Sequence, residues 1–259
     1  MYIQEISFQL AKNFDWDSLE QEFQTLIVAY RNNGQIQDSS INHVFINDEN
    51  KVICTAITIS KDALNKKFNS SAVESSIKKI EQLFNSRLEH KLIGKALINE
   101  MEQCKCKQSE FYVLYTNFLA IGSPIMCGSC FNEVPLYKLP QYDSYGYSPI
   151  LSWETNYKAC DNLQIGCSVG EMWAMKQMWQ ADSQLSKQGI DICKKLTELT
   201  NTPTFYYLFN YRSIRHSKDI QRKCPCCAGE WLLHERLHNL FDFKCDNCNI
   251  ISSLSSNSH

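Results

Sequence analysis

Hydrophobic residues in the first hundred positions recur at two spacings, one typical of strands and one typical of helices. Ile6, Phe8 and Leu10 alternate with polar residues, as in a strand with one buried face. After Asp17, apolar residues recur along one side of a helix, and Glu20 three residues later completes a capping-box pattern. The chain therefore begins with a predicted strand and a predicted helix.

Residues 43–47 and 52–59 then predict a hairpin around a polar turn. A second helix is predicted from Ser71, and a last strand is predicted at 91–98. The order βαββαβ predicts a ferredoxin-like domain over residues 1–100, a two-layer α+β fold. Because that fold serves many functions, it does not by itself indicate a chemistry.

From Cys104 the pattern changes, and residues 101–259 are predicted to form a zinc-binding region. We expect a first zinc ribbon, a helical segment and a second zinc ribbon, at 104–140, 150–200 and 222–252. In the helical segment, Ser168 and Glu171 form another capping-box pattern before a broad apolar face. The last nine residues, ISSLSSNSH, predict a frayed end. The expected fold is an α+β chain in which two zinc-ribbon units flank helices.

Composition narrows the class of protein. The chain has 259 residues, 44% of them hydrophobic, a formal net charge of −2 and 13 cysteines. No apolar run reaches the roughly 18–20 residues of a membrane helix, and the N-terminus lacks the pattern of a secretory signal. In such a chain, cysteines are more often metal ligands and buried thiols than disulfides. We therefore expect a cytoplasmic zinc protein, and its near-neutral charge argues against a histone-like nucleic-acid binder.

The most specific motif consists of two C-x-x-C pairs separated by 17 residues, which supply Cys224, Cys227, Cys245 and Cys248. Two short C-x-x-C turns joined by a hairpin provide the four thiolates of a tetrahedral zinc site. Cys226 lies between two ligands and is predicted to point elsewhere. Ala228 stands where such turns usually carry glycine for positive φ, and Gly229 comes one residue late.

A second, less regular group consists of a C-x-C and a C-x-x-C pair separated by 20 residues, which supply Cys104, Cys106, Cys127 and Cys130. It predicts a second four-cysteine site, so that the chain would hold two structural zinc ions. In the alternative, Cys160 or Cys167 completes the C-x-x-C pair. Otherwise these two cysteines, like Cys54 and Cys193, are predicted to pack in the core.

Residues 234–238, HERLH, match the H-E-x-x-H pattern of zinc proteases. That motif works only on a helix, where both histidines share a face and the glutamate activates a bound water. Here it lies between Trp231–Leu233 and Leu240–Phe243, the predicted strands of the C-terminal hairpin. We therefore interpret it as a solvated hairpin tip.

The segment 211–223 carries five positive side chains against one aspartate: Arg212, Arg215, Lys218, Arg222 and Lys223. The segment runs directly into Cys224. Together with exposed aromatic residues of the ribbon such as Trp231, Phe241 and Phe243, it could contact phosphates and stack on bases. The alternative is a solvated basic loop, and the C-terminal ribbon itself is mildly acidic.

Several runs resemble a widespread bacterial family of uncharacterised proteins: FYVLYTN, PIMCGSC followed by VPLYKLP, ACDNLQIGC, and CPCCAGEW with FDFKCDNC. That family is described as zinc-ribbon-containing, with a suggested nucleic-acid-binding role. The resemblance spans most of the chain after residue 100 and, more loosely, the part before it. It implies metal binding at the two cysteine groups, while Ala228 departs from a C-P-x-C-G turn.

Three functions remain open. The first is a non-enzymatic zinc protein that binds nucleic acid through the C-terminal ribbon and the basic segment. The second is a protein-interaction module, such as an adaptor or an immunity (antitoxin-like) protein, which suits an aromatic content of 12%. The third is an enzyme that uses zinc only structurally, for which the sequence offers no nucleotide-binding loop or catalytic set.

Overall fold

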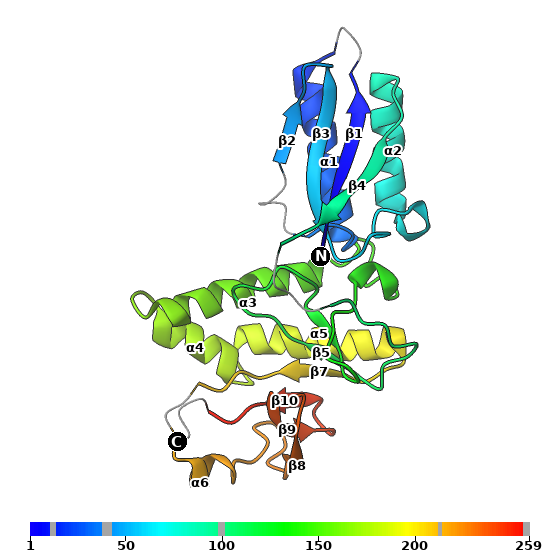
Figure 1. Cartoon of the computed structure of the whole chain (residues 1–259). Helices are drawn as coiled ribbons and strands as arrows, with labels where there is room; N and C mark the ends of the chain where they lie inside the picture. The colour runs from blue at the N-terminus through cyan, green and yellow to red at the C-terminus, as the bar shows by residue number, and fades with distance from the viewer. Residues whose placement is uncertain (11–13, 38–42, 98–101, 212–213, 256–259) are drawn as a thin grey trace. The chain divides into compact units, whose positions relative to one another are not determined.

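The computed structural model of the chain describes residues 1–10, 14–37, 43–97, 102–211 and 214–255 (Figure 1). The chain divides into two compact units. Unit 1 contains Met1–Gln103, Ile121–Ser123 and Pro135–Ser148, and unit 2 contains Cys104–Ala120, Pro124–Val134 and Pro149–His259. Each unit has its own β-sheet, and helices accompany both sheets, which confirms the mixed α+β class.

Unit 1 is built on a four-stranded sheet in the order β2-β3-β1-β4, in which every neighbouring pair is antiparallel. The strands are β1 (Tyr2–Gln9), β2 (His43–Ile46), β3 (Lys51–Thr58) and β4 (Glu89–Lys95). The helices are α1 (Trp16–Asn32) and α2 (Ser71–Phe84), with a 3-10 turn, η2 (Lys66–Phe68), before α2. The elements follow one another as the hydrophobic pattern predicts, with ends shifted by a few residues.

Alternation along the strands places one face of this sheet against the two helices (Figure 1). Val52, Cys54 and Ala56 of β3 are buried, as are Ile6 and Phe8 of β1. They form one hydrophobic cluster with residues of α1 and α2. The buried position of Cys54 confirms its predicted packing role.

Both helices of unit 1 begin slightly before the predicted caps. Asp15 caps α1 by accepting a hydrogen bond from the backbone N–H of Ser18 at 2.9 Å, and Ser70 caps α2 in the same way. The predictions of Asp17 and Ser71 as caps are wrong, because a residue one or two positions earlier offers an equivalent side-chain oxygen. Asp17 instead adds negative charge to the first turn, which the helix dipole favours.

Residues 135–148 rejoin unit 1 after the first cysteine-rich segment. They contain a 3-10 turn, η3 (Leu136–Lys138), and the hydroxyl groups of Tyr137 and Ser60 lie 2.8 Å apart. The last residues of the span 104–140 therefore pack in unit 1 and not beside the cysteines.

Unit 2 is built on a six-stranded sheet in the order β6-β5-β7-β10-β9-β8. Its strands are β5 (Tyr112–Leu114), β6 (Ile125–Cys127), β7 (Thr204–Tyr207), β8 (Leu232–Leu237), β9 (Phe241–Cys245) and β10 (Ile250–Ser252). Strand β7 is parallel to both of its neighbours, and the other pairs are antiparallel. The sequence predicts two separate ribbon units, whereas β7 joins the strands of both cysteine-rich segments in one sheet.

Three helices form the helical segment: α3 (Ser148–Gly166), α4 (Glu171–Trp179) and α5 (Gln184–Thr200). Helix α5 packs on β7, and a short helix, α6 (His216–Asp219), follows in the basic segment. Gly170, with φ of 70°, precedes α4 without a side-chain cap, so the predicted cap at Ser168 is wrong. Glycine adopts this left-handed conformation at little cost, and Gly170 is the last residue of the connection between α3 and α4.

The chain is ordered further toward its end than the serine-rich tail predicts. Strand β10 includes Ile251 and Ser252, and the N–H of Ser255 donates to buried Asp219 at 2.7 Å. The prediction of a frayed end is therefore wrong up to Ser255, and residues 256–259 lie outside the described part of the chain.

Helix α5 approaches β7 closely at Gly189. An added Cβ at this position would overlap the ring of Tyr206 and lie 2.9 Å from Nε1 of Trp153. Both rings are buried in a densely packed interior, so neither can move away without opening the core. Packing therefore requires glycine here, despite its entropic cost inside a helix.

We predict that Gly189→Ala lowers the free energy of unfolding by about 1–3 kcal/mol, the usual cost of overpacking, although alanine favours a helix by about 1 kcal/mol. Urea denaturation of the intact metal-loaded protein measures the change. Gly166→Ala is the matched control, because its added Cβ meets only Ser168 Oγ at 4.0 Å. Equal stability of Gly189→Ala and the unmodified protein would contradict the packing argument.

Candidate metal centres

The second cysteine-rich segment brings four sulfur atoms together beside the β8-β9 hairpin: those of Cys224, Cys227, Cys245 and Cys248. All four lie within 4.8 Å of one another, and the Sγ atoms of Cys227 and Cys245 are 3.6 Å apart. One C-x-x-C pair lies in the turn before β8, and the other connects β9 to β10. Cys226 is not part of this group.

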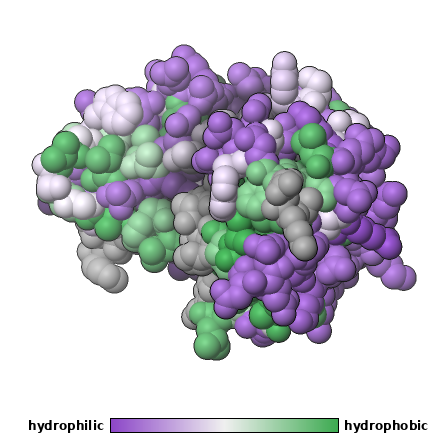
Figure 2. All heavy atoms as spheres, turned by 90° about the horizontal axis from the view of Figure 1, so that it is seen from above, coloured by the Kyte–Doolittle hydropathy of each residue, from purple (hydrophilic) through white to green (hydrophobic). Residues whose placement is uncertain are grey.

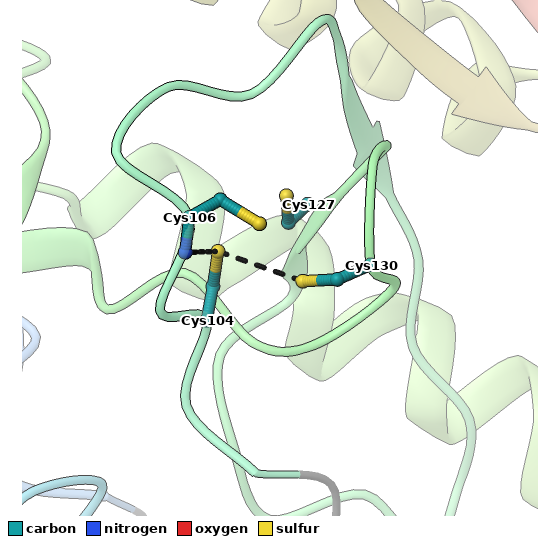
Figure 3. A group of neighbouring side chains, drawn as sticks. All are labelled: Cys104, Cys106, Cys127 and Cys130. Atoms are coloured by element: carbon teal, nitrogen blue, oxygen red, sulfur yellow. Dashed lines mark hydrogen bonds between the residues drawn. The ribbon is translucent and has the colours of Figure 1, made fainter.

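Figure 3 shows the first group, in which four cysteines direct their sulfur atoms toward a common centre: Cys104, Cys106, Cys127 and Cys130. These sulfur atoms also lie within 4.8 Å of one another, and those of Cys104 and Cys130 are 3.6 Å apart. The N–H of Cys106 lies 3.4 Å from Cys104 Sγ, which closes the tighter C-x-C turn. Cys160 and Cys167 belong to neither group, so the alternative in which one of them completes the first site is wrong.

Each C-x-x-C turn is closed by the residue that follows its second cysteine. Phe131, Ala228 and Asn249 occupy these positions, with φ of 55°, 57° and 51°. The N–H of Ala228 donates to the carbonyl oxygen of Cys224 at 2.8 Å, and Phe131 does the same with Cys127 at 2.7 Å. Ala228 thus adopts a left-handed conformation at a cost of roughly 1–2 kcal/mol relative to glycine. Its departure from the usual turn sequence changes the local strain and not the placement of the sulfur atoms.

Ser109 and Gly128 anchor the C-x-x-C turn of the first group. The N–H of Gly128 donates to the carbonyl oxygen of Phe111 at 2.7 Å and to Ser109 Oγ at 3.1 Å. Ser109 Oγ also lies 3.2 Å from Cys127 Sγ, and any Cβ at position 128 would overlap the Phe111 ring. The turn is therefore fixed against the segment that leads into β5.

The thiols within each group differ in acidity. Partial burial raises the pKa of Cys127, but hydrogen bonds from Ser109 and from backbone N–H groups outweigh it and lower the pKa to about 6. The backbone N–H of Gly229 and the neighbouring thiols lower the pKa of Cys227 to about 7. Burial raises the pKa of Cys104 and of Cys248 well above the usual thiol range. Cys127 and Cys227 are thus the thiols of the two groups with a lowered pKa, and a cation bound in either group would displace protons from Cys104 or Cys248.

Both groups fit a tetrahedral metal ion. Four thiolates at about 2.3 Å from a metal place neighbouring sulfur atoms about 3.8 Å apart. The 3.6 Å separations agree with that value. Four protein ligands leave no open position for water or substrate, so a metal ion in either group would cross-link the chain and not catalyse a reaction.

The HERLH motif does not form a helix. Its first residues lie on strand β8, where His234 and Glu235 are exposed and Arg236 pairs with Asp242 at 3.1 Å. Side chains on a strand alternate between faces, so the motif does not have the helical geometry of a protease site. This agrees with the rejection of a protease from the sequence.

His238, the last residue of the motif, contacts the first cysteine group. Its Nε2 lies 2.7 Å from the carbonyl oxygen of Gly128, and its ring stacks on Phe131 with centroids 5.2 Å apart. One side chain therefore links the hairpin of the second group to the turn of the first. The prediction of a solvated tip is wrong for His238, because the sequence does not reveal that the two segments meet in one sheet.

The turn of the first group and the hairpin of the second also share a hydrophobic core. This core contains Val113, Met126, Phe131, Phe205, Tyr207, Phe241 and Ile251. Phe131 from the first turn and Phe241 from β9 meet edge to face, with centroids 5.2 Å apart. The two candidate metal centres thus lie beside the same hydrophobic core.

The residues predicted to bind nucleic acid fall into two sets. Arg222 is held by internal contacts, and Trp231 is 3% exposed, with Nε1 donating to the carbonyl oxygen of Arg222 at 2.7 Å. Phe241 and Phe243 are fully buried as well, so the prediction of these three residues as exposed stacking residues is wrong. Arg215, Lys218 and Lys223 are exposed. Arg212 lies outside the described residues.

The cysteines outside the two groups are mostly buried. Cys160 and Cys193 lie in the interior of unit 2, which agrees with their predicted packing role. Cys167 is exposed after the end of α3, so the same prediction is wrong for it. Cys226 is also exposed. In the described part of the chain, every helix is too short or too polar to cross a membrane.

Comparison with known proteins places this architecture in a family. Three domains of unknown function match the chain: DUF8589 at residues 1–94, DUF2310 at 106–209 and DUF8594 at 214–258. A Haemophilus influenzae protein named "Uncharacterized protein" is 28% identical over 267 residues, covering 99% of both chains. Another with the same printed name and organism is 34% identical over 145 residues, covering 56% of this chain and 71% of the relative. The chain belongs to this family of uncharacterised proteins, and DUF2310 matches its middle part.

We predict that the purified chain binds two metal ions, one in each cysteine group. Replacing Cys127 and Cys130, or Cys245 and Cys248, with serine should reduce the count to one, because two ligands do not hold a structural ion. Elemental analysis of the dialysed protein measures the stoichiometry, and Cys226→Ser is the matched control. A single ion in the unmodified protein would contradict one of the two sites.

His238 provides a second prediction. His238→Ala removes a hydrogen bond and a ring contact, together worth about 1–2 kcal/mol, and should therefore speed metal loss from the first group roughly tenfold. Alkylation of individual cysteines in the presence of a chelator, followed by mass spectrometry, separates the two groups. His234→Ala on exposed β8 is the control, and equal rates in both variants would rule out the coupling.

Proposed function

We propose that the chain is a non-enzymatic protein in which two structural zinc ions stabilise unit 2, and that unit 2 binds a protein partner through an apolar surface on α3 and α4. Four thiolates in a closed tetrahedral arrangement are typical of structural zinc. The C-x-x-C turns next to a hairpin support the description of the C-terminal part as a zinc ribbon. The βαββαβ order and the strand order of unit 1 support a ferredoxin-like description.

The observation that carries this function is a cluster of exposed apolar side chains where α3 ends and α4 begins. Ile165, Val169, Met172 and Trp173 are 49%, 71%, 59% and 59% exposed. In Figure 2, hydrophobic side chains gather on the left of the view, over this junction. Soluble proteins rarely expose apolar residues in such groups unless the surface binds something, and Met and Trp are enriched in interface cores. We call this the α3-α4 surface.

A groove of about 230 Å³ adjoins the α3-α4 surface, with Trp173 in its lining. None of the residues that line it is charged. Leucine and alanine line it together with four side-chain amides, those of Asn156, Gln177, Gln184 and Gln188. Such a groove suits an uncharged, apolar segment of a partner protein whose backbone can hydrogen-bond to the amides. Nucleic acid, with its charged backbone, suits it less well.

Nucleic-acid binding is the second candidate function. Arg215, Lys218 and Lys223 are exposed around α6 and support it, because exposed cations next to a ribbon can bind phosphates. The internal contacts of Arg222 and the burial of Trp231 weaken it. The protein-binding function is therefore the better supported.

Replacing both Met172 and Trp173 with glutamine should weaken partner binding at least tenfold, about 1.4 kcal/mol, since large aromatic residues dominate interface energies. Zinc-loaded protein is immobilised and exposed to extract from cells that produce it naturally. A retained protein is then purified, and its binding to the chain is measured with both components pure. Leu119→Gln, at a residue of unit 2 that is 70% exposed, is the matched control.

The proposal requires a stoichiometric complex that the double variant loses and the control keeps. If the complex still forms with the double variant, the partner does not bind at the α3-α4 surface. Titration with single- and double-stranded DNA and RNA at about 50 and 200 mM salt tests the second candidate, because phosphate-driven affinity falls steeply over that range. Salt-sensitive binding together with no protein partner would favour the second candidate.

A further inference from the structure

A cleft of about 740 Å³ opens in unit 2 beside the turn that carries Cys224 and Cys227. Its walls come from the connection between α4 and α5, the segment after β7, and the residues before and within that turn. Its volume lies in the range of small-molecule sites. It shares no lining residue with the groove beside the α3-α4 surface.

A buried carboxylate fixes the polar wall of this cleft. Asp219 is fully buried, forms an ion pair with Arg222 Nε at 3.2 Å, and accepts hydrogen bonds from Asn210 Nδ2 at 3.4 Å and from the N–H of Ser255 at 2.7 Å. The guanidinium of Arg222 also lies over the ring of Phe243, 4.3 Å from its centroid. Arg222 and Asn210, which both line the cleft, are thus held in place before a ligand arrives, which reduces the entropic cost of binding.

Among the residues that line the cleft, positive side chains outnumber negative ones. Lys187 on α5 and Lys223 are exposed, and Asp182 is the one carboxylate among the described lining residues. Lys223 pairs with Glu230 at the surface, an interaction that is usually weak and leaves the ammonium group available to a ligand. Two ammonium groups near a fixed guanidinium favour an anion, and the phosphate group suits such donors best.

Aromatic side chains lie next to these cations. Trp179 and Phe209 line the cleft, and the Phe209 ring stacks on exposed Tyr211 with centroids 6.1 Å apart. A planar ring bound beside a phosphate would bury apolar area against such side chains. Cations alone would bind any anion. The aromatic residues beside them favour a ligand that carries both a phosphate group and a planar ring.

We propose that the cleft binds a nucleoside monophosphate, with the phosphate near Lys187 and Lys223 and the base beside Trp179. The ligand could be a free nucleotide or the phosphorylated end of a nucleic-acid strand, since both carry the same chemical group. The site does not depend on the α3-α4 surface or on its protein partner.

Cys226 supplies a readout at the site itself. It lines the cleft, is exposed and belongs to neither cysteine group, whereas Cys167 is an exposed thiol on another part of unit 2. Zinc-loaded protein is treated with a maleimide, and the alkylation rate of each cysteine is followed by mass spectrometry. Adenosine 5′-monophosphate at about 10 mM should slow the alkylation of Cys226 roughly tenfold if its Kd is near 1 mM, and leave Cys167 unchanged.

Matched variants locate the effect. Lys187→Glu should abolish the protection, because it places a negative charge beside the phosphate. Lys194→Glu makes the same change two turns further along α5, at a residue whose side chain is 65% exposed, and should keep the protection. Adenosine, which lacks the phosphate, should not protect Cys226.

Two arms distinguish the sources of the ligand. Equal or better protection by a short 5′-phosphorylated oligonucleotide assigns the cleft to a strand end, and protection by the free nucleotide alone assigns it to a metabolite. Both results support the site. Unchanged alkylation of Cys226 with every probe, or protection that persists in Lys187→Glu, would overturn it.

Discussion

The position of β7 is the constraint on which unit 2 depends. Its aromatic residues are buried, and each edge of the strand pairs with another segment, β5 on one side and β10 on the other. On the β10 side, the N–H groups of Tyr206 and Leu208 donate to the carbonyl oxygens of Asn249 and Ile251 at 2.8 Å. A buried strand must pair along both edges, because unpaired backbone groups away from water are costly. The segments that carry the two cysteine groups, at residues 104–130 and 224–248, are therefore joined in one sheet.

Metal ions bound in the two cysteine groups and this sheet would stabilise each other. The described strands of unit 2 are all three to six residues long, and such short strands form a weak sheet without additional links. A tetrahedral ion in each group would tie the loop before β5 to β6 and the turn before β8 to the β9-β10 connection. Between the two groups, Phe131, His238 and Phe241 form a continuous set of ring contacts. The free energy of metal binding in the two groups would thus contribute directly to the folding of unit 2.

Local patterns in the sequence predict those features of the structure that depend on residues close together in the chain. The spacing of cysteines identifies the two groups, and the spacing of hydrophobic residues identifies the strands and helices of unit 1. Pairing over long distances has no such pattern, so the single six-stranded sheet and the contact of His238 with Gly128 were not predicted. Burial was misjudged for the same reason. Arg222 lies in a basic run that resembles a binding surface, and Trp231 follows that run. Arg222 nevertheless pairs with Asp219 of the same run, and Phe243, from β9, packs against both Arg222 and Trp231. The prediction that Cys167 packs in the core is wrong because helix α3 ends at Gly166, one residue before it.

The fixed arrangement around Asp219 also links the cleft to the second metal centre. Arg222 and Lys223 immediately precede Cys224, and Cys226 lies inside the same turn, so one wall of the cleft is part of the metal-binding turn. A ligand that binds only when this wall is formed stabilises the metal-loaded conformation, and the metal must in turn strengthen ligand binding by the same factor. The α3-α4 surface has no such connection, because its side chains come from the end of α3, the start of α4 and the turn between them. Loss of a metal ion from the second group should therefore weaken ligand binding in the cleft more than partner binding at the α3-α4 surface. Equal weakening at both would instead indicate that the metal supports the whole of unit 2.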